Sequence, residues 1–232
     1  MTSDERVPSG VPGLDNTIKG GFRQGSVNLI AGNVGSGKTT FAMQFLLEGL
    51  KRGENGIFIS FEETKQKLFD DFIEFGWNLA EYERAGQLTV VEYTPEQVRR
   101  HVAEGGGTID VLVAQMNAKR MVVDSITSFS MLFRDKLGKR ESSLALFDLF
   151  TKWGCTAVLT SQATKVSADE IEAELEFEAD SIIVLHHFKK KGVRERALEV
   201  LKMRATKTPE KTMKMEIGDH GMSVDPNKIV SI

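Results

Sequence analysis

Gly32-Asn33-Val34-Gly35-Ser36-Gly37-Lys38-Thr39-Thr40 is the stretch of sequence from which the fold can be predicted. Its first eight residues match the spacing G-x-x-x-x-G-K-[ST] of a phosphate loop. The apolar residues 27–31 before it favour a strand, and a helix is predicted to begin near Lys38. A strand, a glycine-rich loop and a helix in this order predict an α/β fold with a nucleotide at the loop.

The residue types within the loop indicate how it would hold a triphosphate with Mg²⁺. Glycines let backbone N–H groups approach the phosphates, and the following helix adds the positive end of its dipole. Lys38 is expected to neutralise the β- and γ-phosphates, and the Thr39 hydroxyl to bind Mg²⁺. The alternative, a flexible turn that happens to contain Gly-Lys-Thr, does not explain the flanking strand and helix. The predicted binding residues are Asn33, Val34, Gly35, Ser36, Gly37, Lys38, Thr39 and Thr40.

Apolar, β-branched segments recur along the chain with room for a crossover helix between them. They are residues 26–31, 56–60, 88–92, 121–124 and 156–160. This alternation predicts a mostly parallel sheet. Leu144, Phe147, Phe150 and Trp153 form the apolar stripe of a core-facing helix, which Gly154 is predicted to end.

The last quarter of the chain predicts an antiparallel extension of this sheet. Residues 180–188 and 197–203 are strand-like and flank a polar connection that contains Gly192. A further strand is expected at 212–217 and a short one at 222–224. No repeat or linker interrupts the chain, so we expect a single domain over residues 1–232.

Polar residues at strand ends are predicted to complete the site. Asp124 ends an apolar segment at the edge where a parallel sheet presents residues to a ligand, so it is expected to support the magnesium's water shell. Gln162, after the fifth segment, could sense the γ-phosphate. The alternative for Asp124 is a surface aspartate that merely closes a strand.

Glu62 and Glu63 follow the second segment at the same predicted edge. Either carboxylate could orient and deprotonate an attacking water. The alternative is a solvated first turn of a helix that begins near Thr64, where acids suit the helix dipole. The residues leave open which of the two would be the base.

The expected nucleotide is ATP. Guanine specificity usually requires Asn/Thr-Lys-x-Asp after a late strand. Residues 164–167 read Thr-Lys-Val-Ser and residues 227–230 read Asn-Lys-Ile-Val, so neither supplies the aspartate.

Composition excludes several other classes of protein. A net charge of -3 gives no general attraction to nucleic acid or anionic membranes. The single cysteine, Cys155, excludes an internal disulfide framework and a Cys-based metal cluster, and we expect a buried, inert thiol. No segment approaches the ~18 consecutive apolar residues of a membrane span. We expect a cytoplasmic protein without membrane insertion.

Several motifs together resemble the KaiC family of RecA-superfamily ATPases. Upstream of the loop these are Gly13-Leu14-Asp15, Gly20-Gly21-Phe22 and Gly25, and downstream Glu62-Glu63, Val123-Asp124-Ser125 and Leu201-Lys202-Met203-Arg204-Ala205-Thr206. The similarity spans residues 7–224. It implies a RecA-like core with strand order 5-1-4-3-2 and a C-terminal hairpin, assembled into a homo-oligomeric ring, commonly a hexamer. ATP would then lie between subunits, with Lys202 and Arg204 reaching the neighbour's γ-phosphate.

The sequence also departs from that family. Circadian KaiC proteins have two tandem domains, and their second domain phosphorylates a Ser-Thr pair. The corresponding positions here are Glu176 and Phe177, so we expect no autokinase activity. Recombinases of the superfamily bind DNA through loops, but residues 163–180 carry seven acids against one lysine, Lys165, which would repel a phosphate backbone. Nucleic acid is therefore not an expected partner.

Together these features predict a ring-forming, slowly hydrolysing, magnesium-dependent ATPase whose nucleotide state is coupled to an unidentified protein partner. One alternative is a regulator that binds ATP without turnover, as in KaiC-like regulators of motility. Another is a paralogue of DNA-repair recombinases. Lys189, Lys190 and Lys191 are expected to form a solvated hairpin tip, with a docking patch as the alternative.

Overall fold

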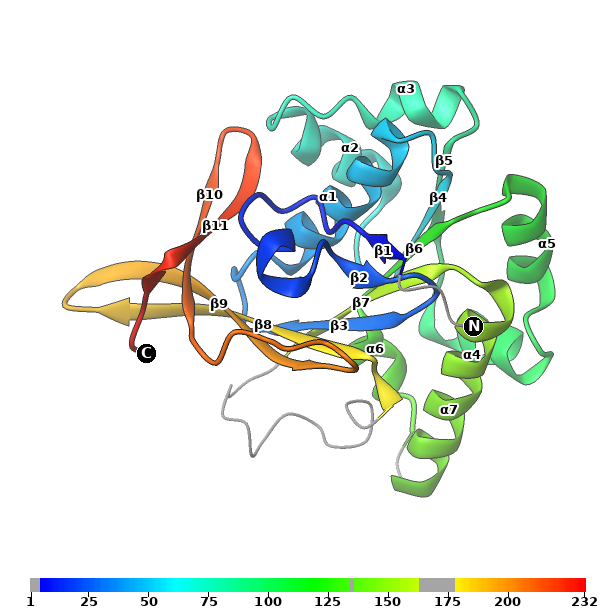
Figure 1. Cartoon of the computed structure of the whole chain (residues 1–232). Coiled ribbons are helices and arrows are strands. Elements are labelled where there is room, and N and C mark those ends of the chain that lie inside the picture. The colour runs from blue at the N-terminus through cyan, green and yellow to red at the C-terminus, as the bar shows by residue number, and fades with distance from the viewer. Residues whose placement is uncertain (1–4, 134–135, 163–177) are drawn as a thin grey trace.

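The computed structural model describes residues 5–133, 136–162 and 178–232 (Figure 1). These residues form a nine-stranded sheet in the order β11-β10-β9-β8-β3-β7-β6-β4-β5 and a separate pair, β1-β2. The strands are β1 (Arg6–Val7), β2 (Phe22–Arg23), β3 (Val27–Gly32), β4 (Gly56–Ser60), β5 (Leu88–Glu92), β6 (Arg120–Asp124), β7 (Thr156–Gln162), β8 (Ser181–Lys190), β9 (Val193–Met203), β10 (Met213–Gly218) and β11 (Gly221–Ile229).

Helices cover both faces of the sheet (Figure 1). The helices are the 3₁₀ turn η1 (Asp15–Ile18), α1 (Lys38–Lys51), α2 (Lys65–Ile73), α3 (Leu79–Arg84), α4 (Pro95–Ala103), α5 (Gly107–Met116), α6 (Ile126–Ser130) and α7 (Lys136–Trp153). Because successive strand residues point to opposite faces, Ile30 joins the core under α1 to α3, whereas Leu29 joins the core under α4 to α7. Two apolar layers therefore hold the sheet between them.

The predicted fold class is confirmed, because the sheet is mostly parallel and carries a C-terminal antiparallel hairpin. Strands β4 and β5 match the predicted boundaries, and β3, β6 and β7 differ by one or two residues. The helix with the Phe147 and Phe150 stripe buries both rings and ends before Gly154. Strands β8, β9 and β11 are longer than predicted, and β11 runs from Gly221 to Ile229, whereas β10 is shifted by one residue.

The predicted core strand order 5-1-4-3-2 is confirmed. Numbered from the strand before the phosphate loop, the core strands are β3, β4, β6, β7 and β8, and they lie in the order β8-β3-β7-β6-β4, with β5 added beside β4 at the edge of the sheet. Strand β7 lies between β3 and β6, and β8 occupies the other side of β3. Buried polar contacts favour this arrangement, since the Asn28 amide donates to the Ala157 carbonyl of β7 at 3.0 Å and accepts from the Ser181 hydroxyl of β8 at 2.6 Å.

Cys155 is buried immediately before β7. Burial raises the pKa of its thiol to about 11, so the thiol stays protonated at neutral pH. A protonated, enclosed thiol is a poor nucleophile, in agreement with the expectation from sequence. No helix within the described ranges is long and apolar enough to cross a bilayer.

Arg120 is a buried cation that the sequence does not single out. It is 1% exposed at the start of β6, and its guanidinium lies 4.7 Å from the centre of the Phe45 ring. Its Nη1 donates to the Pro8 carbonyl at 2.7 Å and to the Phe45 carbonyl at 2.8 Å, while Nε donates to Glu54 Oε2 at 2.5 Å. One side chain thus connects β6, α1 and the N-terminal loop.

We predict that Arg120→Met lowers the free energy of unfolding by about 2–4 kcal/mol, because the Pro8 and Phe45 carbonyls lose their charged donor. Denaturant unfolding followed by circular dichroism measures the change. The matched control is Arg84→Met on the exposed end of α3, where an effect within about 0.5 kcal/mol is expected. Equal effects of the two substitutions would contradict a structural role for Arg120.

Candidate active site

The glycine-rich loop joins the buried end of β3 to the start of α1. Gly35 and Gly37 have φ of 73° and 99°, in the left-handed region that favours glycine. A Cβ on Gly37 would lie 2.6 Å from Ile217 Cδ1, and one on Gly32 would lie 2.5 Å from the Leu185 carbonyl oxygen. Both the backbone shape and the close packing therefore require glycine.

Lys38 lies at the N-terminus of α1 and turns back over the loop. Its ammonium donates to the carbonyls of Gly32 at 3.0 Å and Asn33 at 3.1 Å. Burial lowers the pKa of Lys38, while the nearby carboxylates of Asp124 and Glu62 act in the opposite direction. A partly desolvated cation at a helix N-terminus is suited to bind phosphate.

The Ser36 hydroxyl is a further polar group in the loop. Ser36 is fully buried, and within the described residues its Oγ has no hydrogen-bond partner. Buried hydroxyls normally have a partner, so this atom indicates that the loop is built for a ligand that supplies one. Of the other predicted binding residues, Val34 is 75% exposed at the loop surface and Thr40 is half-buried in the first turn of α1.

The predicted metal-site residues Thr39 and Asp124 lie together. Asp124, at the end of β6, accepts hydrogen bonds from the side chains of Thr160 and Thr39. Burial is the largest influence on Asp124 and raises its pKa, and the hydrogen bonds from the two threonines partly oppose this. A cis peptide bond joins Asp124 to Ser125.

The two adjacent glutamates have different surroundings. Glu62 Oε1 accepts from the Ser125 hydroxyl at 3.0 Å and the Ser128 hydroxyl at 2.8 Å, which directs it to the Asp124 edge of the sheet. Glu63 instead pairs with Lys67 at 2.6 Å, one turn along α2. The geometry thus distinguishes two residues that sequence left equivalent, because only Glu62 is held next to Asp124.

Gln162 is the last residue of β7 and pairs with Gly32 in the sheet. Its backbone N–H donates to the Thr127 hydroxyl at 2.8 Å. The residue therefore lies beside Gly32, at the start of the phosphate loop.

Lys202 and Arg204 lie toward the amino ends of the parallel strands, whereas the phosphate loop lies at their carboxyl ends. Lys202 of β9 pairs with Ile182 of β8, and Ile182 pairs with Leu29 of β3. Lys202 therefore lies roughly 10 Å from Gly32 along the strand direction and roughly 10 Å from it across the sheet. Arg204 follows the end of β9, and its Nη1 lies 3.5 Å from Asp180 Oδ1. Neither residue is placed to contact the phosphate loop of its own chain.

Sequence reasoning missed the residues that attach the loop to β8 and β9. The Asn33 side-chain amide donates to the His187 carbonyl at 2.7 Å and accepts from the His187 N–H at 3.2 Å. Arg196, opposite His187 on β9, donates from Nε to the Gly35 carbonyl at 3.2 Å. These residues are more than 150 positions apart, so no local pattern could have identified the contacts.

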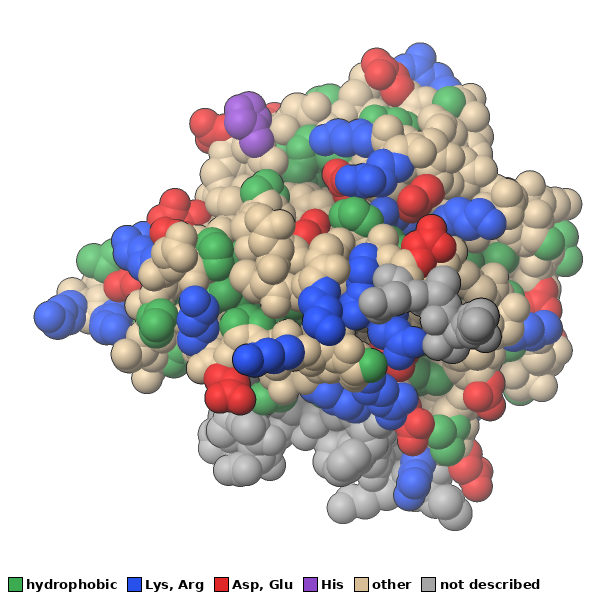
Figure 2. Space-filling view, in the orientation of Figure 1, with side chains coloured by type: hydrophobic (Ala, Val, Ile, Leu, Met, Phe, Trp, Pro, Cys, Tyr) green, Lys and Arg blue, Asp and Glu red, His purple; other side chains and the backbone are tan. Residues whose placement is uncertain are grey.

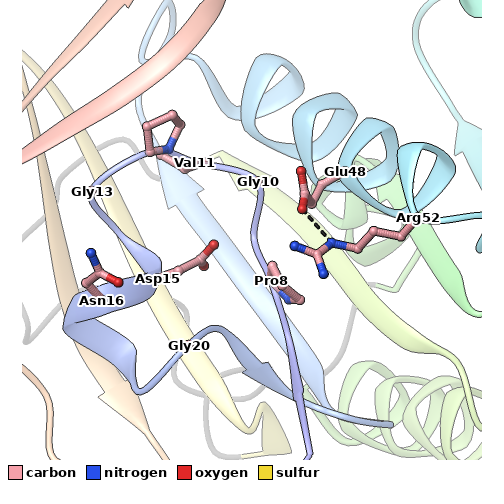
Figure 3. Close-up of a pocket in the computed structure, with 10 residues that line it drawn as sticks. Pro8, Gly10, Val11, Gly13, Asp15, Asn16, Gly20, Glu48 and Arg52 are labelled. Atoms are coloured by element: carbon pink, nitrogen blue, oxygen red, sulfur yellow. Dashed lines mark hydrogen bonds and ion pairs between the residues drawn. The ribbon is translucent and has the colours of Figure 1, made fainter.

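A hollow of about 420 Å³ lies between the N-terminal loop and α1 (Figure 3). Its charged side chains are engaged within the chain, since Arg52 pairs with Glu48 at 2.6 Å and Asp15 accepts from the Ser9 N–H at 2.8 Å. We assign it no part in the site.

Among the described residues no three His, Cys, Asp or Glu side chains cluster as metal ligands. Magnesium at a phosphate loop does not need such a cluster, because it takes its ligands from phosphates, water and a hydroxyl.

Comparison with known proteins identifies the family. A family model described as "ATPase: KaiC" matches residues 7–229. The chain belongs to the KaiC ATPase family. A crystal structure of a KaiC-like protein from Pyrococcus horikoshii has a TM-score of 0.83 and 35% identity to this KaiC-family chain, with 96% and 99% of the two chains covered.

Some relatives are about as long as this chain, and others are much longer. The chain is 32% identical over 213 residues to circadian clock protein KaiC3 of Synechocystis, covering 87% of this chain but only 42% of KaiC3. It is 34% identical over 241 residues to a UPF0273 protein of Aeropyrum pernix, covering 98% of this chain and 96% of that protein. Family membership supports an ATP-binding ATPase.

Some features predicted from sequence lie outside the described residues. These are positions Glu176 and Phe177 and most of the acidic stretch 163–180.

We predict that Asn33→Ala lowers the free energy of unfolding by about 1–2 kcal/mol, because the His187 backbone groups lose their partners. The loop also loses a restraint on its binding geometry, so ATP affinity should fall roughly three- to tenfold. Denaturant unfolding and titration with a fluorescent ATP analogue measure the two effects. Asn16→Ala, at an exposed position of η1, is the matched control and should change neither. Unchanged ATP affinity in Asn33→Ala would show that the attachment to His187 does not shape the loop.

Proposed function

We propose that the protein is a slow, magnesium-dependent ATPase that assembles through its nucleotide sites into a ring and couples its nucleotide state to a protein partner. The observation that carries the catalytic part is the position of Glu62, held by two serine hydroxyls beside Asp124, Thr39 and Lys38. The proposal takes the chain as one domain that works in the cytoplasm.

The residues present fit a magnesium nucleotide. The Thr39 hydroxyl next to the Asp124 carboxylate offers one direct ligand and one acceptor for metal-bound water. Bound magnesium would neutralise phosphate charge during transfer. Lys38 binds the β- and γ-phosphates, the loop N–H groups orient them, and Gln162 lies where a γ-phosphate sensor is needed.

Glu62 orients the attacking water and accepts its proton. Serine hydroxyls donating to Oε1 hold the carboxylate in place, and Oε2 is left to contact water. Glu63 is already engaged with Lys67, so we assign it no chemical role.

Glu62→Gln should lower kcat for ATP hydrolysis by about 100-fold or more, since an amide cannot accept the proton. Glu63→Gln is the matched control and should stay within about threefold of the wild type. Phosphate release by the assembled protein measures both, and ATP binding by each variant is measured separately. Equal turnover by wild type and Glu62→Gln would exclude Glu62 as the base. Tight ATP binding by the wild type without phosphate release would favour the non-hydrolysing regulator.

Lys202 and Arg204 complete the site of a neighbouring subunit. They lie at the amino edge of the sheet, away from their own phosphate loop, so they can reach a γ-phosphate only on another copy. Head-to-tail contact of this kind produces a closed ring when its rotation closes. Cations supplied in trans stabilise the charge that develops on the transferred phosphoryl group.

Mixing Lys38→Ala subunits with Arg204→Ala subunits tests action in trans. Each variant alone should be inactive, whereas some interfaces in mixed rings combine an intact loop with an intact Arg204 and regain about a quarter of wild-type turnover. Mixing is verified with differently labelled subunits. Mixed rings without recovered hydrolysis would exclude action in trans.

A further inference from the structure

Strand β9 contains a β-bulge immediately before the two cations that are proposed to act in trans. Ile183 of β8 pairs with Val200 of β9. The next pair is Ile182 with Lys202, so Leu201 is an extra residue between them. A bulge changes the direction of the side chains beyond it, and bulges are frequent next to active sites. The end of β9 is therefore reoriented by one inserted residue.

The bulge decides which face of the sheet Lys202 occupies. Val200 is buried in the core under α1 to α3, and regular alternation would place Lys202 and then Arg204 on that face as well. Because of the extra residue, Lys202 instead shares a face with its partner Ile182, which belongs to the core under α4 to α7. Met203 takes the place in the first core. The bulge thus keeps two cations out of an apolar layer.

Asp180 stands opposite Arg204, one step beyond the last pair of the β8–β9 ladder. The Arg204 N–H donates to the Asp180 carbonyl at 2.8 Å, and Arg204 Nη1 lies 3.5 Å from Asp180 Oδ1. The other carboxylate oxygen, Oδ2, accepts from the N–H of Val27 at the start of β3 at 3.0 Å. One carboxylate therefore holds the guanidinium of Arg204 relative to the strand that carries the phosphate loop.

Arg204 lies in a part of the surface that is rich in cations. Arg6 and Arg23 are cross-strand partners in β1–β2, and Arg6 Nη1 donates to the Thr206 hydroxyl at 3.0 Å, two residues after Arg204. Figure 2 shows Lys and Arg side chains gathered over the N-terminal loop and the end of the β8–β9 pair. Because like charges repel one another, a carboxylate is needed to hold a guanidinium in one position among them.

We propose that Asp180 is a positioning residue that directs the guanidinium of Arg204 toward the nucleotide of a neighbouring copy. The inference rests on the proposed function, because it takes Arg204 to act in trans. A guanidinium has five N–H donors in a planar fork, so it can contact a carboxylate and a phosphate oxygen at the same time. The ion pair is half-exposed and contributes little to folding stability, so its effect is on the geometry of the reacting groups.

Asp180→Asn separates the two contacts of the carboxylate. The amide oxygen of asparagine can still accept from the Val27 N–H, whereas the charge that attracts Arg204 is lost. We expect kcat for ATP hydrolysis to fall about ten- to 100-fold, because small displacements of a catalytic group have effects of this size. KM should change by less than about twofold, because the phosphate loop of the same subunit is intact.

The matched control is Asp148→Asn at an exposed position of α7, which should leave both constants unchanged. Circular dichroism verifies that each variant is folded. Asp180→Ser, whose hydroxyl can also accept from the Val27 N–H, is the second variant and should show the same loss of kcat. Unchanged kcat in folded Asp180→Asn or Asp180→Ser would overturn the proposal.

Mixed rings show which subunit's site is damaged. Asp180→Asn subunits are combined with Lys38→Ala subunits, which supply an intact Arg204 but no working loop. We expect recovery to about a quarter of wild-type turnover, because some Asp180→Asn loops then face an intact Arg204. Asp180→Asn combined with Arg204→Ala should stay at the level of Asp180→Asn alone. The reverse pattern would place the damage in the loop of the same subunit, through Val27, and overturn the proposal.

The mixture of Lys38→Ala with Arg204→Ala is measured alongside, so that the role of Asp180 and the proposed function are judged separately. Recovery in that mixture, but none in Asp180→Asn with Lys38→Ala, would overturn the role of Asp180 alone. Differently labelled subunits verify mixing in both samples. No recovery in either mixture would overturn action in trans, and the role of Asp180 with it.

Discussion

The parallel pairing of β3 with both β7 and β8 is the constraint on which the rest of the structure depends. Because β3 has partners on both sides, its carboxyl end at Gly32 lies between Gln162 and Leu185. The buried Asn28 amide bonds to both neighbours and fixes this order from inside the sheet. The phosphate loop therefore starts from a position that cannot shift without breaking two strand ladders and a buried polar contact.

Burial gives the site its electrostatic character. It lowers the pKa of Lys38 and raises that of Asp124, so each charged group is less stable there than in water. The two charges partly compensate one another, and threonine hydroxyls solvate the carboxylate. Such an arrangement costs stability in the protein alone and strengthens interactions with a charged ligand, which is typical of functional sites.

The loop is also attached to a part of the chain remote in sequence. Asn33 binds the His187 backbone, Arg196 binds the Gly35 carbonyl, and Ile217 packs against Gly37. The C-terminal hairpins thus contact the nucleotide loop directly, although the sequence suggested only an appended hairpin with a solvated basic tip. This attachment is a physical route by which contacts at the C-terminal hairpins and nucleotide binding can influence each other.

By itself the sequence determined the fold class, the phosphate loop, the boundaries of β4 and β5 and the antiparallel hairpin, because these depend on local periodicity and residue spacing. It also placed Thr39, Asp124 and Gln162 at one edge, since parallel strands share that edge. Only the tertiary structure decided the position of β5 at the edge of the sheet, the different surroundings of Glu62 and Glu63, the burial of Arg120 and the loop contacts of His187 and Arg196. Each of these depends on packing between segments far apart in the chain, and the pattern within a single segment carries no record of such partners.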